Sequence, residues 1–488
     1  MSLVQPVDNV ALLPGYLAAG TAVLVLLVDL LVARPAVTVA VAALGAAGTA
    51  AGAALVGAAG ERRTFCVGVD CSWVWNGRAA LVAAVIALLT LGVLAISGPL
   101  LRAGRTPAGE YCFLLACAMT GGVVLGAAGD LITLLVALET LTLPLYVLVG
   151  LRRASLAGAE AAVTFFVVSV VATTVTLLGA ALLYAVTGSL HLDRLGATLA
   201  ARDDLRDLPL TTVAVALVVA GLAFKVAAVP FHAWAPVTYD GAPLPVAAYL
   251  STASKLGGVV ALLAVVQRAL PAGVTGPVLA ALAALTMTVG NLVALRQRRT
   301  VRLLAWSSVA QAGYILAPLG ALALAAGRTA DARDGAYAAA VAYAVFFVLL
   351  ELAAFAAVVA LRPADGDGGT LADLRGAARR HPWVGGALAL ALIGLAGLPP
   401  GLAGLFAKVT VVRSLLAGHA GWLALMVALN AVLGLAYYLR VAATLYAVPS
   451  GVAATRPART VAIALGVVTV AAVVIGFAPQ LVLDVAAR

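Results

Sequence analysis

Residues 222–255 read LAFKVAAVPFHAWAPVTYDGAPLPVAAYLSTASK, and this stretch decides the fold. It joins two long apolar segments, and the first of them is interrupted at Pro230. Proline removes a backbone donor and clashes with the preceding turn, so the segment should break or kink there. A second apolar segment, GLAGLPPGLAGLFAKV, is interrupted in the same way at Pro399 and Pro400. Discontinuous helices in corresponding positions are typical of transporters built from inverted repeats.

The composition of the whole chain is that of a polytopic membrane protein. Of its 488 residues, 64% are hydrophobic and 10% are charged, which excludes an ordinary water-soluble domain. A spanning helix needs about 20 largely apolar residues, and only helices or closed barrels satisfy their backbone in lipid. Here the apolar runs are continuous rather than alternating, so they indicate helices and not a barrel.

Breaks between the apolar runs predict about fourteen membrane helices in a single membrane domain, 1–488. The predicted ranges are 12–32, 36–59, 79–101, 110–128, 131–151, 160–186, 210–230, 244–267, 274–295, 302–323, 335–361, 384–412, 419–446 and 460–483. The two interrupted helices are the seventh and the twelfth in this order. Their separation by five helices predicts two inverted five-helix repeats, over 110–267 and 274–446.

The positive charge is explained by membrane topology. The chain carries a formal net charge of +10, but its arginines lie mostly at helix ends and in loops, so we expect no nucleic-acid partner. Alternate loops that contain Arg34, Arg102, Arg152, Arg153 and 296–302 are modestly richer in arginine than the others. Under the positive-inside rule, both termini are predicted to lie outside. The first residues lack a basic region, so no removable signal peptide is predicted.

Four cysteines form two pairs with different interpretations. Cys66 and Cys71 lie in a polar loop, where they form a disulfide if the loop faces an oxidising compartment. Two cysteines cannot make a closed zinc site. Cys112 and Cys117 lie within an apolar run and are interpreted as packing residues.

Only three of the thirty basic residues are lysines, and all three lie inside apolar segments: Lys225, Lys255 and Lys408. A lysine at mid-membrane depth costs several kcal/mol to insert, roughly 2.5–3.5 on insertion scales. Unlike arginine, a buried lysine shifts towards neutrality and can accept and release a proton near physiological pH. We therefore expect these residues to move protons.

Glu139 lies in the middle of another predicted helix, LITLLVALETLTLPLYVLVG. A carboxylate at this depth can stay ionised opposite a lysine on another helix, and Lys225 is the predicted partner. The alternative is a permanently protonated carboxyl that is hydrogen bonded to Thr140 or Thr142. For Lys225, the alternative is a side chain that extends to the membrane surface from a helix end.

Lys255 has at least eleven residues on either side in an uninterrupted predicted helix, and Ser251, Thr252 and Ser254 could hold water for proton transfer. His232 follows the first break and could connect the interior to one face, although an interfacial histidine beside Trp234 is equally ordinary. Glu351 is a second mid-membrane carboxylate. We find no nucleotide-binding loop, cysteine cluster or haem-type histidine pair, so no cofactor or metal site is expected in this chain.

At these residues the sequence closely resembles the subunit N family of bacterial NADH–quinone oxidoreductase (respiratory complex I), a relative of Mrp-type cation/proton antiporter subunits. The resemblance covers about 110–484, and the TYDGAP element at 238–243 points to subunit N. It is carried by VALETLTLPLYVL (136–148), the stretch 222–255, GNLVALRQ (290–297), RLLAWSSVAQAGY (302–314) and LAGLPPGLAGLFAK (395–408).

This resemblance implies a proton-translocating subunit of the bacterial inner membrane that works with other membrane and peripheral subunits. Glu139 and Lys225 would form the ion pair of the first half-channel, Lys255 the central relay and Lys408 the terminal relay. FMN, iron–sulfur clusters and the quinone would belong to partner subunits, with redox energy arriving by long-range coupling. An Mrp-type Na⁺/H⁺ antiporter subunit is the alternative.

Three positions depart from the family pattern. Thr164 stands where the family often has a lysine in its sixth helix, and Gln311 replaces the usual histidine of the tenth. Glu351 stands in place of the usual asparagine in the eleventh. The resemblance therefore predicts a pathway that lacks one lysine and one titrating histidine but has an additional carboxylate.

Overall fold

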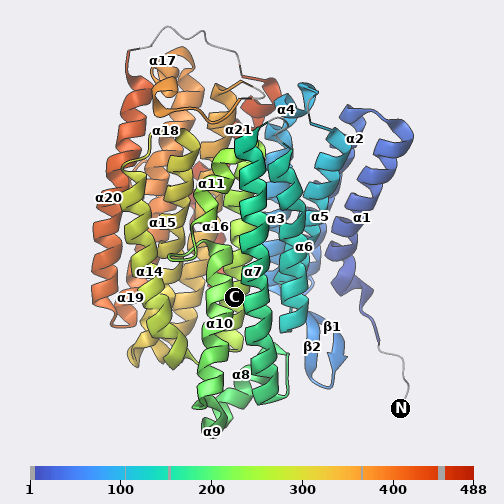
Figure 1. Cartoon of the computed structure of the whole chain (residues 1–488), viewed down its shortest axis with the longest axis vertical. Helices are drawn as coiled ribbons and strands as arrows, with labels where there is room; N and C mark the ends of the chain where they lie inside the picture. The colour runs from blue at the N-terminus through green and yellow to red at the C-terminus, as the bar shows by residue number, and fades with distance from the viewer. Residues whose placement is uncertain (1–5, 105, 152–154, 364–365, 449–456, 488) are drawn as a thin grey trace.

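The computed structural model describes residues 6–104, 106–151, 155–363, 366–448 and 457–487 (Figure 1). Its helices run side by side in one bundle, with a small hairpin at one end. Among the described residues, twelve helices are long and apolar enough to cross a membrane. Many leucine and valine side chains are exposed on the outside of the bundle, for example Leu30 and Leu31, as expected for surfaces that face lipid.

The N-terminal part packs against one edge of the bundle. Asp8 caps the first helix by accepting hydrogen bonds from the amides of Val10 and Ala11, and its carboxylate pairs with Arg62 at the base of the hairpin. The elements are α1 (Asn9–Val32), α2 (Pro35–Ala58), β1 (Arg62–Val67), β2 (Asp70–Trp75), α3 (Gly77–Ile96) and α4 (Gly98–Arg102).

The hairpin pairs β1 with β2 in antiparallel register, so that Cys66 lies opposite Cys71. These two cysteines are joined by a disulfide. Cys112 and Cys117 are free, and Cys112 is buried, as the sequence interpretation expected of packing residues.

The first central group carries two irregular membrane segments. Its elements are α5 (Ala108–Gly126), α6 (Leu131–Gly150), α7 (Leu156–Thr187), α8 (Leu192–Ala201), α9 (Asp203–Arg206), α10 (Pro209–Val226), α11 (Trp234–Gly241), α12 (Leu244–Tyr249), the π-helical turn η1 (Leu250–Ser254) and α13 (Lys255–Arg268). Between α10 and α11 the helix is interrupted: Ala227 has a left-handed backbone, and Pro230 follows it.

The second central group ends with the other interrupted helix and three further helices. Its elements are α14 (Ala272–Ala294), α15 (Thr300–Gly320), η2 (Ala321–Ala323), η3 (Ala326–Arg328), α16 (Ala330–Leu361), η4 (Leu371–Leu374), α17 (Ala377–Arg380), α18 (Pro382–Ala396), α19 (Leu402–Ala417), α20 (Gly421–Tyr446), α21 (Arg459–Phe477) and α22 (Gln480–Ala487). The break between α18 and α19 falls at Pro399 and Pro400.

The all-helical fold and both proline breaks agree with the sequence prediction. Each of the fourteen predicted ranges contains helix, but in the seventh the helix α10 ends at Val226, and the twelfth is divided into α18 and α19. The prediction of an uninterrupted helix over 244–267 is confirmed by the single span Leu244–Arg268, within which the π-helical turn η1 lies directly before Lys255 and was not predicted. Arg152 and Arg153, which contributed to the predicted topology, lie outside the described residues.

Candidate functional site

Glu139 and Lys225 form an ion pair inside the first central group. Glu139 is on α6, and Lys225 lies one residue before α10 ends at the first break. Lys225 Nζ lies 2.8 Å from Glu139 Oε1, and the side chains are 5% and 21% exposed. The lysine therefore turns inward rather than towards the surface. Thr140, which was considered as a partner of a protonated Glu139, instead donates to the carbonyl of Val136.

Hydroxyl groups surround this pair. Thr173 of α7 donates to Glu139 Oε1 at 2.5 Å, and Thr142 donates to Oε2 at 3.3 Å. Lys225 Nζ also donates to Ser169 Oγ at 2.8 Å. The hydroxyl of Tyr146 donates to the same Ser169 oxygen at 2.5 Å. Both charges are thus solvated by side-chain hydroxyls, which lowers the cost of holding them away from water.

Lys255 begins α13 at the end of the π-helical turn and is 2% exposed. Its Nζ donates to the backbone carbonyl of Ser308 on α15 at 2.7 Å. Ser251 and Thr252, which were expected to hold water beside it, both donate to the carbonyl of Ala248. The structure thus gives Lys255 a carbonyl of the second central group as its acceptor, across the boundary between the two groups.

Glu351 lies on α16 with 0% exposure. Its charge and that of Lys255 interact, but within the described part of the chain neither carboxylate oxygen of Glu351 has a hydrogen-bond partner. Burying a carboxylate without a hydrogen-bond partner destabilises the fold, and an apolar side chain would fill the same position without that cost. Glu351 is therefore a buried carboxylate whose charge acts on that of Lys255.

Gln311 of α15 is the centre of a hydrogen-bonded cluster between the central and terminal lysines. Its Oε1 accepts from Tyr343 at 2.6 Å, and its Nε2 donates to Tyr438 at 3.2 Å. Tyr438 in turn is hydrogen bonded to Ser307, the residue before Ser308. The position where the family usually has histidine is therefore occupied by an amide that orients two tyrosine hydroxyls.

Lys408 of α19 reaches back across the second break. Its Nζ donates to the carbonyl of Ala396, the last residue of α18, at 2.6 Å. The same Nζ lies 4.8 Å from the centre of the Tyr314 ring, so the ring face also contacts the ammonium group. The carbonyl that accepts from Lys408 is one that the interrupted helix leaves without an intrahelical partner.

His232 lies in the first break and does not contact the ion pair of Glu139 and Lys225. Its Nδ1 is 3.3 Å from the carbonyl of Pro230, and its ring packs against Trp306 with centroids 5.0 Å apart. The ring is partly exposed. This environment is that of an aromatic contact between the break and α15.

The partners supplied by α7 and by the loops were not predicted from the sequence. Ser169 and Thr173 are four residues apart, which places both hydroxyls on one face of α7, and this spacing in an apolar helix was a readable signal. Asp240, within TYDGAP, accepts from Arg299, which also donates to Asp367. These two carboxylates raise the pKa of the Arg299 guanidinium. Arg299, directly before α15, therefore connects the end of α11 with the loop that follows α16.

Among the residues that the structure describes, no three His, Cys, Asp or Glu side chains are grouped as metal ligands. The arrangement is instead a series of charged and hydroxyl side chains in the membrane interior. Lys225, Lys255 and Lys408 each have a different acceptor, from Glu139 at one end to the Ala396 carbonyl at the other. Such a series can pass protons but offers no redox centre.

Comparison with known proteins gives consistent matches. The family model described as NADH:quinone oxidoreductase/Mrp antiporter, TM, matches residues 128–434. NADH-quinone oxidoreductase subunit N of Salinispora tropica is 77% identical, with 100% of both chains covered. A chain of respiratory complex I from Thermus thermophilus has a TM-score of 0.79 and 30% identity, covering 97% of this chain and 99% of that one.

The antiporter alternative is matched less closely. A chain of the Mrp complex from Dietzia superimposes with a TM-score of 0.83, covering 97% of this chain and 96% of that one. Its identity is 22%, so this likeness shows the fold alone. The full-length relative favours subunit N over the antiporter.

Proposed function

Because the chain belongs to the subunit N family of NADH-quinone oxidoreductases, we propose that its buried charges are the proton pathway of such a complex. The chain is an integral membrane subunit of an NADH-quinone oxidoreductase, which couples electron transfer from NADH to quinone to proton pumping. FMN, the iron–sulfur clusters and the quinone belong to the partner subunits. The observation that carries the proposed pathway is the buried pair of Glu139 and Lys225.

The ion pair acts as a gate in this proposal. Removing one partner of a buried pair costs about 3–5 kcal/mol, because the other charge is left uncompensated. Protonation of Glu139 would have a similar effect on Lys225 and would favour release of a proton from the lysine. Ser169 and Tyr146 supply hydroxyls beside the lysine that can both accept and donate a proton.

The central and terminal lysines continue the pathway. Lys255 and Lys408 each donate to a backbone carbonyl rather than to a carboxylate, so each can exist with or without its extra proton. The hydroxyl groups of Tyr438, Tyr343 and Ser307 lie between them around Gln311. Glu351 supplies a carboxylate that can compensate Lys255 when the lysine is charged.

The domain arrangement that we propose is two inverted five-helix repeats, 110–267 and 274–446. An interrupted helix in each group, α10/α11 and α18/α19, supports this division, as does a lysine close to each break. We also propose that both termini lie outside. His232 would connect the first break to the adjacent membrane face.

The test is proton pumping by the intact complex in proteoliposomes. Lys225→Ala should abolish most NADH-driven acidification, because Glu139 loses its partner, while electron transfer from NADH to an artificial acceptor continues. Arg413→Ala is the control, since it removes an exposed positive charge of α19. Normal pumping by the Lys225→Ala complex would contradict the proposed pathway.

A further inference from the structure

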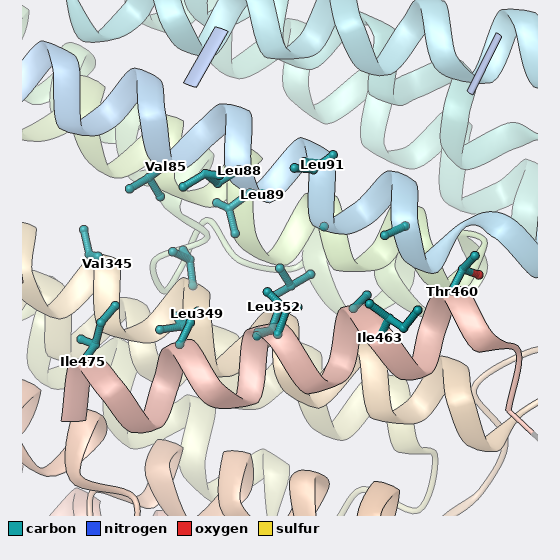
Figure 2. A pocket seen from close by; sticks show the side chains of 17 residues that line it. Val85, Leu88, Leu89, Leu91, Val345, Leu349, Leu352, Thr460, Ile463 and Ile475 are labelled. Carbon is teal, nitrogen blue, oxygen red and sulfur yellow. The ribbon is translucent and has the colours of Figure 1, made fainter. Parts of the chain in front are cut away.

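An apolar furrow runs between α3, α16 and α21 on the outside of the bundle. We use "furrow" for this cavity of about 560 Å³, which is lined by valine, leucine, isoleucine, alanine and glycine, with Thr460 at one end. Figure 2 shows Leu88 and Leu91 of α3 on one side, with Leu352 of α16 and Ile463 of α21 on the other. The furrow therefore offers water almost no hydrogen-bonding groups and suits an apolar occupant.

A second cavity of about 240 Å³ lies at the hairpin end of the same region. Its polar wall contains three arginines, Arg63, Arg78 and Arg268, with Glu61, Asp193 and Gln267. We call this cavity the arginine mouth. It is positioned where β2 leads into α3 and where α13 ends, which is the level at which spanning helices meet the membrane surface.

The mouth and the furrow are neighbouring cavities along α3. A small pocket of about 10 Å³ lies between them. It shares Val82 and Val260 with the mouth, and Val85 and Val345 with the furrow. Along α3 the residues that line these cavities extend from Val82 to Ala95, about 20 Å at the rise of an α-helix. This exceeds the roughly 15 Å that is half of the hydrocarbon core of a bilayer.

The mouth has one arginine whose charge is not neutralised. Arg63 pairs with Glu61, and Arg268 pairs with Asp193. Within the described part of the chain Arg78 has no carboxylate partner: it donates to Gln267 Oε1 at 2.8 Å, and its Nε is buried without a partner. Arg78 is also in the first turn of α3, whose amide groups add positive potential. The mouth is therefore suited to an anion.

We propose that this site binds an anionic phospholipid of the surrounding bilayer. Its phosphate lies at Arg78 in the mouth, and an acyl chain extends through the narrow pocket, made of valine, leucine and alanine side chains, into the furrow. Guanidinium groups bind phosphate well, and burial of each methylene of the chain contributes about 0.8 kcal/mol. A small soluble anion would leave the furrow empty, and a quinone would leave the charge of Arg78 without an anion. The proposal is independent of the proton pathway.

The experiment uses the intact complex in detergent with phosphatidylglycerol that carries a photoreactive group on its acyl chain. After illumination, mass spectrometry of peptides should locate the crosslinks on α3, α16 or α21 within the furrow. Unlabelled phosphatidylglycerol should compete about tenfold better than phosphatidylcholine, because the cationic headgroup of the latter meets the arginines. Equal competition by the two lipids, or the absence of furrow crosslinks because another subunit covers it, would overturn the proposal.

Paired variants test the two ends of the site separately. Arg78→Gln should weaken phosphatidylglycerol binding by about tenfold or more, since a hydrogen bond between charged groups is lost, and Arg78→Lys should retain most of it. Arg202→Gln removes an exposed arginine at the end of α8 and should bind as the parent does. Wild-type affinity in Arg78→Gln would refute the role of the mouth.

In the furrow, Ala471→Phe should block the acyl chain and abolish the crosslinks, because Ala471 lines the cavity. Ala462→Phe places the same side chain at an exposed position on the same helix and should leave the crosslinks unchanged. Crosslinking that survives Ala471→Phe would overturn the placement of the chain even if the Arg78 variants fail to assemble.

Discussion

At the scale of single residues, the three lysines differ in what accepts their hydrogen bonds. Lys225 has a carboxylate acceptor, whereas Lys255 and Lys408 have backbone carbonyls. A carboxylate can take up a proton and lose its charge, whereas a backbone carbonyl remains a neutral acceptor. The pair on α6 and α10 is therefore the place where a change of charge on one residue most directly alters the other.

Thr173 tests how strongly the hydroxyl groups hold the charge of Glu139. Its hydroxyl donates to Glu139 Oε1, so Thr173→Val should favour the protonated carboxyl and reduce pumping by about tenfold, since a hydrogen bond to a charged group is worth about 1.5–3 kcal/mol. The measurement is the initial rate of acidification per NADH oxidised in proteoliposomes. Thr174→Val is the control, because Thr174 is exposed and donates to the Val170 carbonyl. Equal effects of the two variants would show that the contact with Glu139 is not responsible.

Glu351 provides a second test at this scale. Glu351→Gln keeps the shape of the side chain but removes the negative charge that can compensate Lys255, so pumping should fall severalfold. Assembly should be preserved or improved, because a buried unpartnered charge no longer has to be accommodated. Pumping and thermal inactivation are measured together, with Glu160→Gln on the exposed face of α7 as the control. Unchanged pumping in Glu351→Gln would exclude Glu351 from the pathway.

At the scale of the elements, the helix breaks caused by proline were predicted from the sequence, whereas features that depend on helix packing were not. The breaks at Pro230 and Pro399–Pro400 follow from lost donors and steric conflict, so local sequence was sufficient. The π-helical turn before Lys255 has no comparable local signal, because Leu250–Ser254 contains neither proline nor glycine. The Glu139–Lys225 partnership was predicted from depth and charge, whereas the contribution of α7 depends on its rotation in the bundle.

Gly258 controls the distance between α13 and α10. A Cβ at this position would lie 2.8 Å from the carbonyl oxygen of Lys225, which is closer than normal contacts allow. Gly258→Ala should therefore displace the backbone that carries Lys225 and lower pumping severalfold, without removing any charged group. Gly466→Ala is the control, because nothing lies within 4 Å of its added Cβ. If both alanine variants pump normally, the separation of α10 and α13 does not position the ion pair.

At the scale of the whole molecule, composition was enough to predict the helical membrane fold, because lipid leaves few ways to satisfy a backbone. How the two central groups of helices pack against each other depends on long-range contacts, which cannot be read from a single sequence. Asp240 and Arg299, for example, are far apart in the chain, and their pairing was not predicted. The furrow was likewise unforeseen, because α3, α16 and α21 come from three distant parts of the sequence.

The orientation of the whole molecule can be tested through its cysteines. Asp8 pairs with Arg62, so the N-terminal end of α1 and the hairpin with Cys66 and Cys71 lie on the same face. If that face is outside, an impermeant reductant followed by an impermeant maleimide should label the hairpin in right-side-out vesicles but not in inverted ones. Without reductant neither preparation should be labelled there, because both thiols are in the disulfide.

Ala372→Cys supplies the matched control for this experiment. Ala372 is exposed in η4, five residues before α17 begins, and α17 lies at the opposite end of the bundle from the hairpin (Figure 1). Its thiol should react only in inverted vesicles, whereas Cys112 is buried and should react in neither. Hairpin labelling confined to inverted vesicles would place the N-terminus inside and reverse the direction of every proposed half-channel. The pattern of labelling at the two positions therefore fixes the direction in which the pathway from Glu139 to Lys408 moves protons.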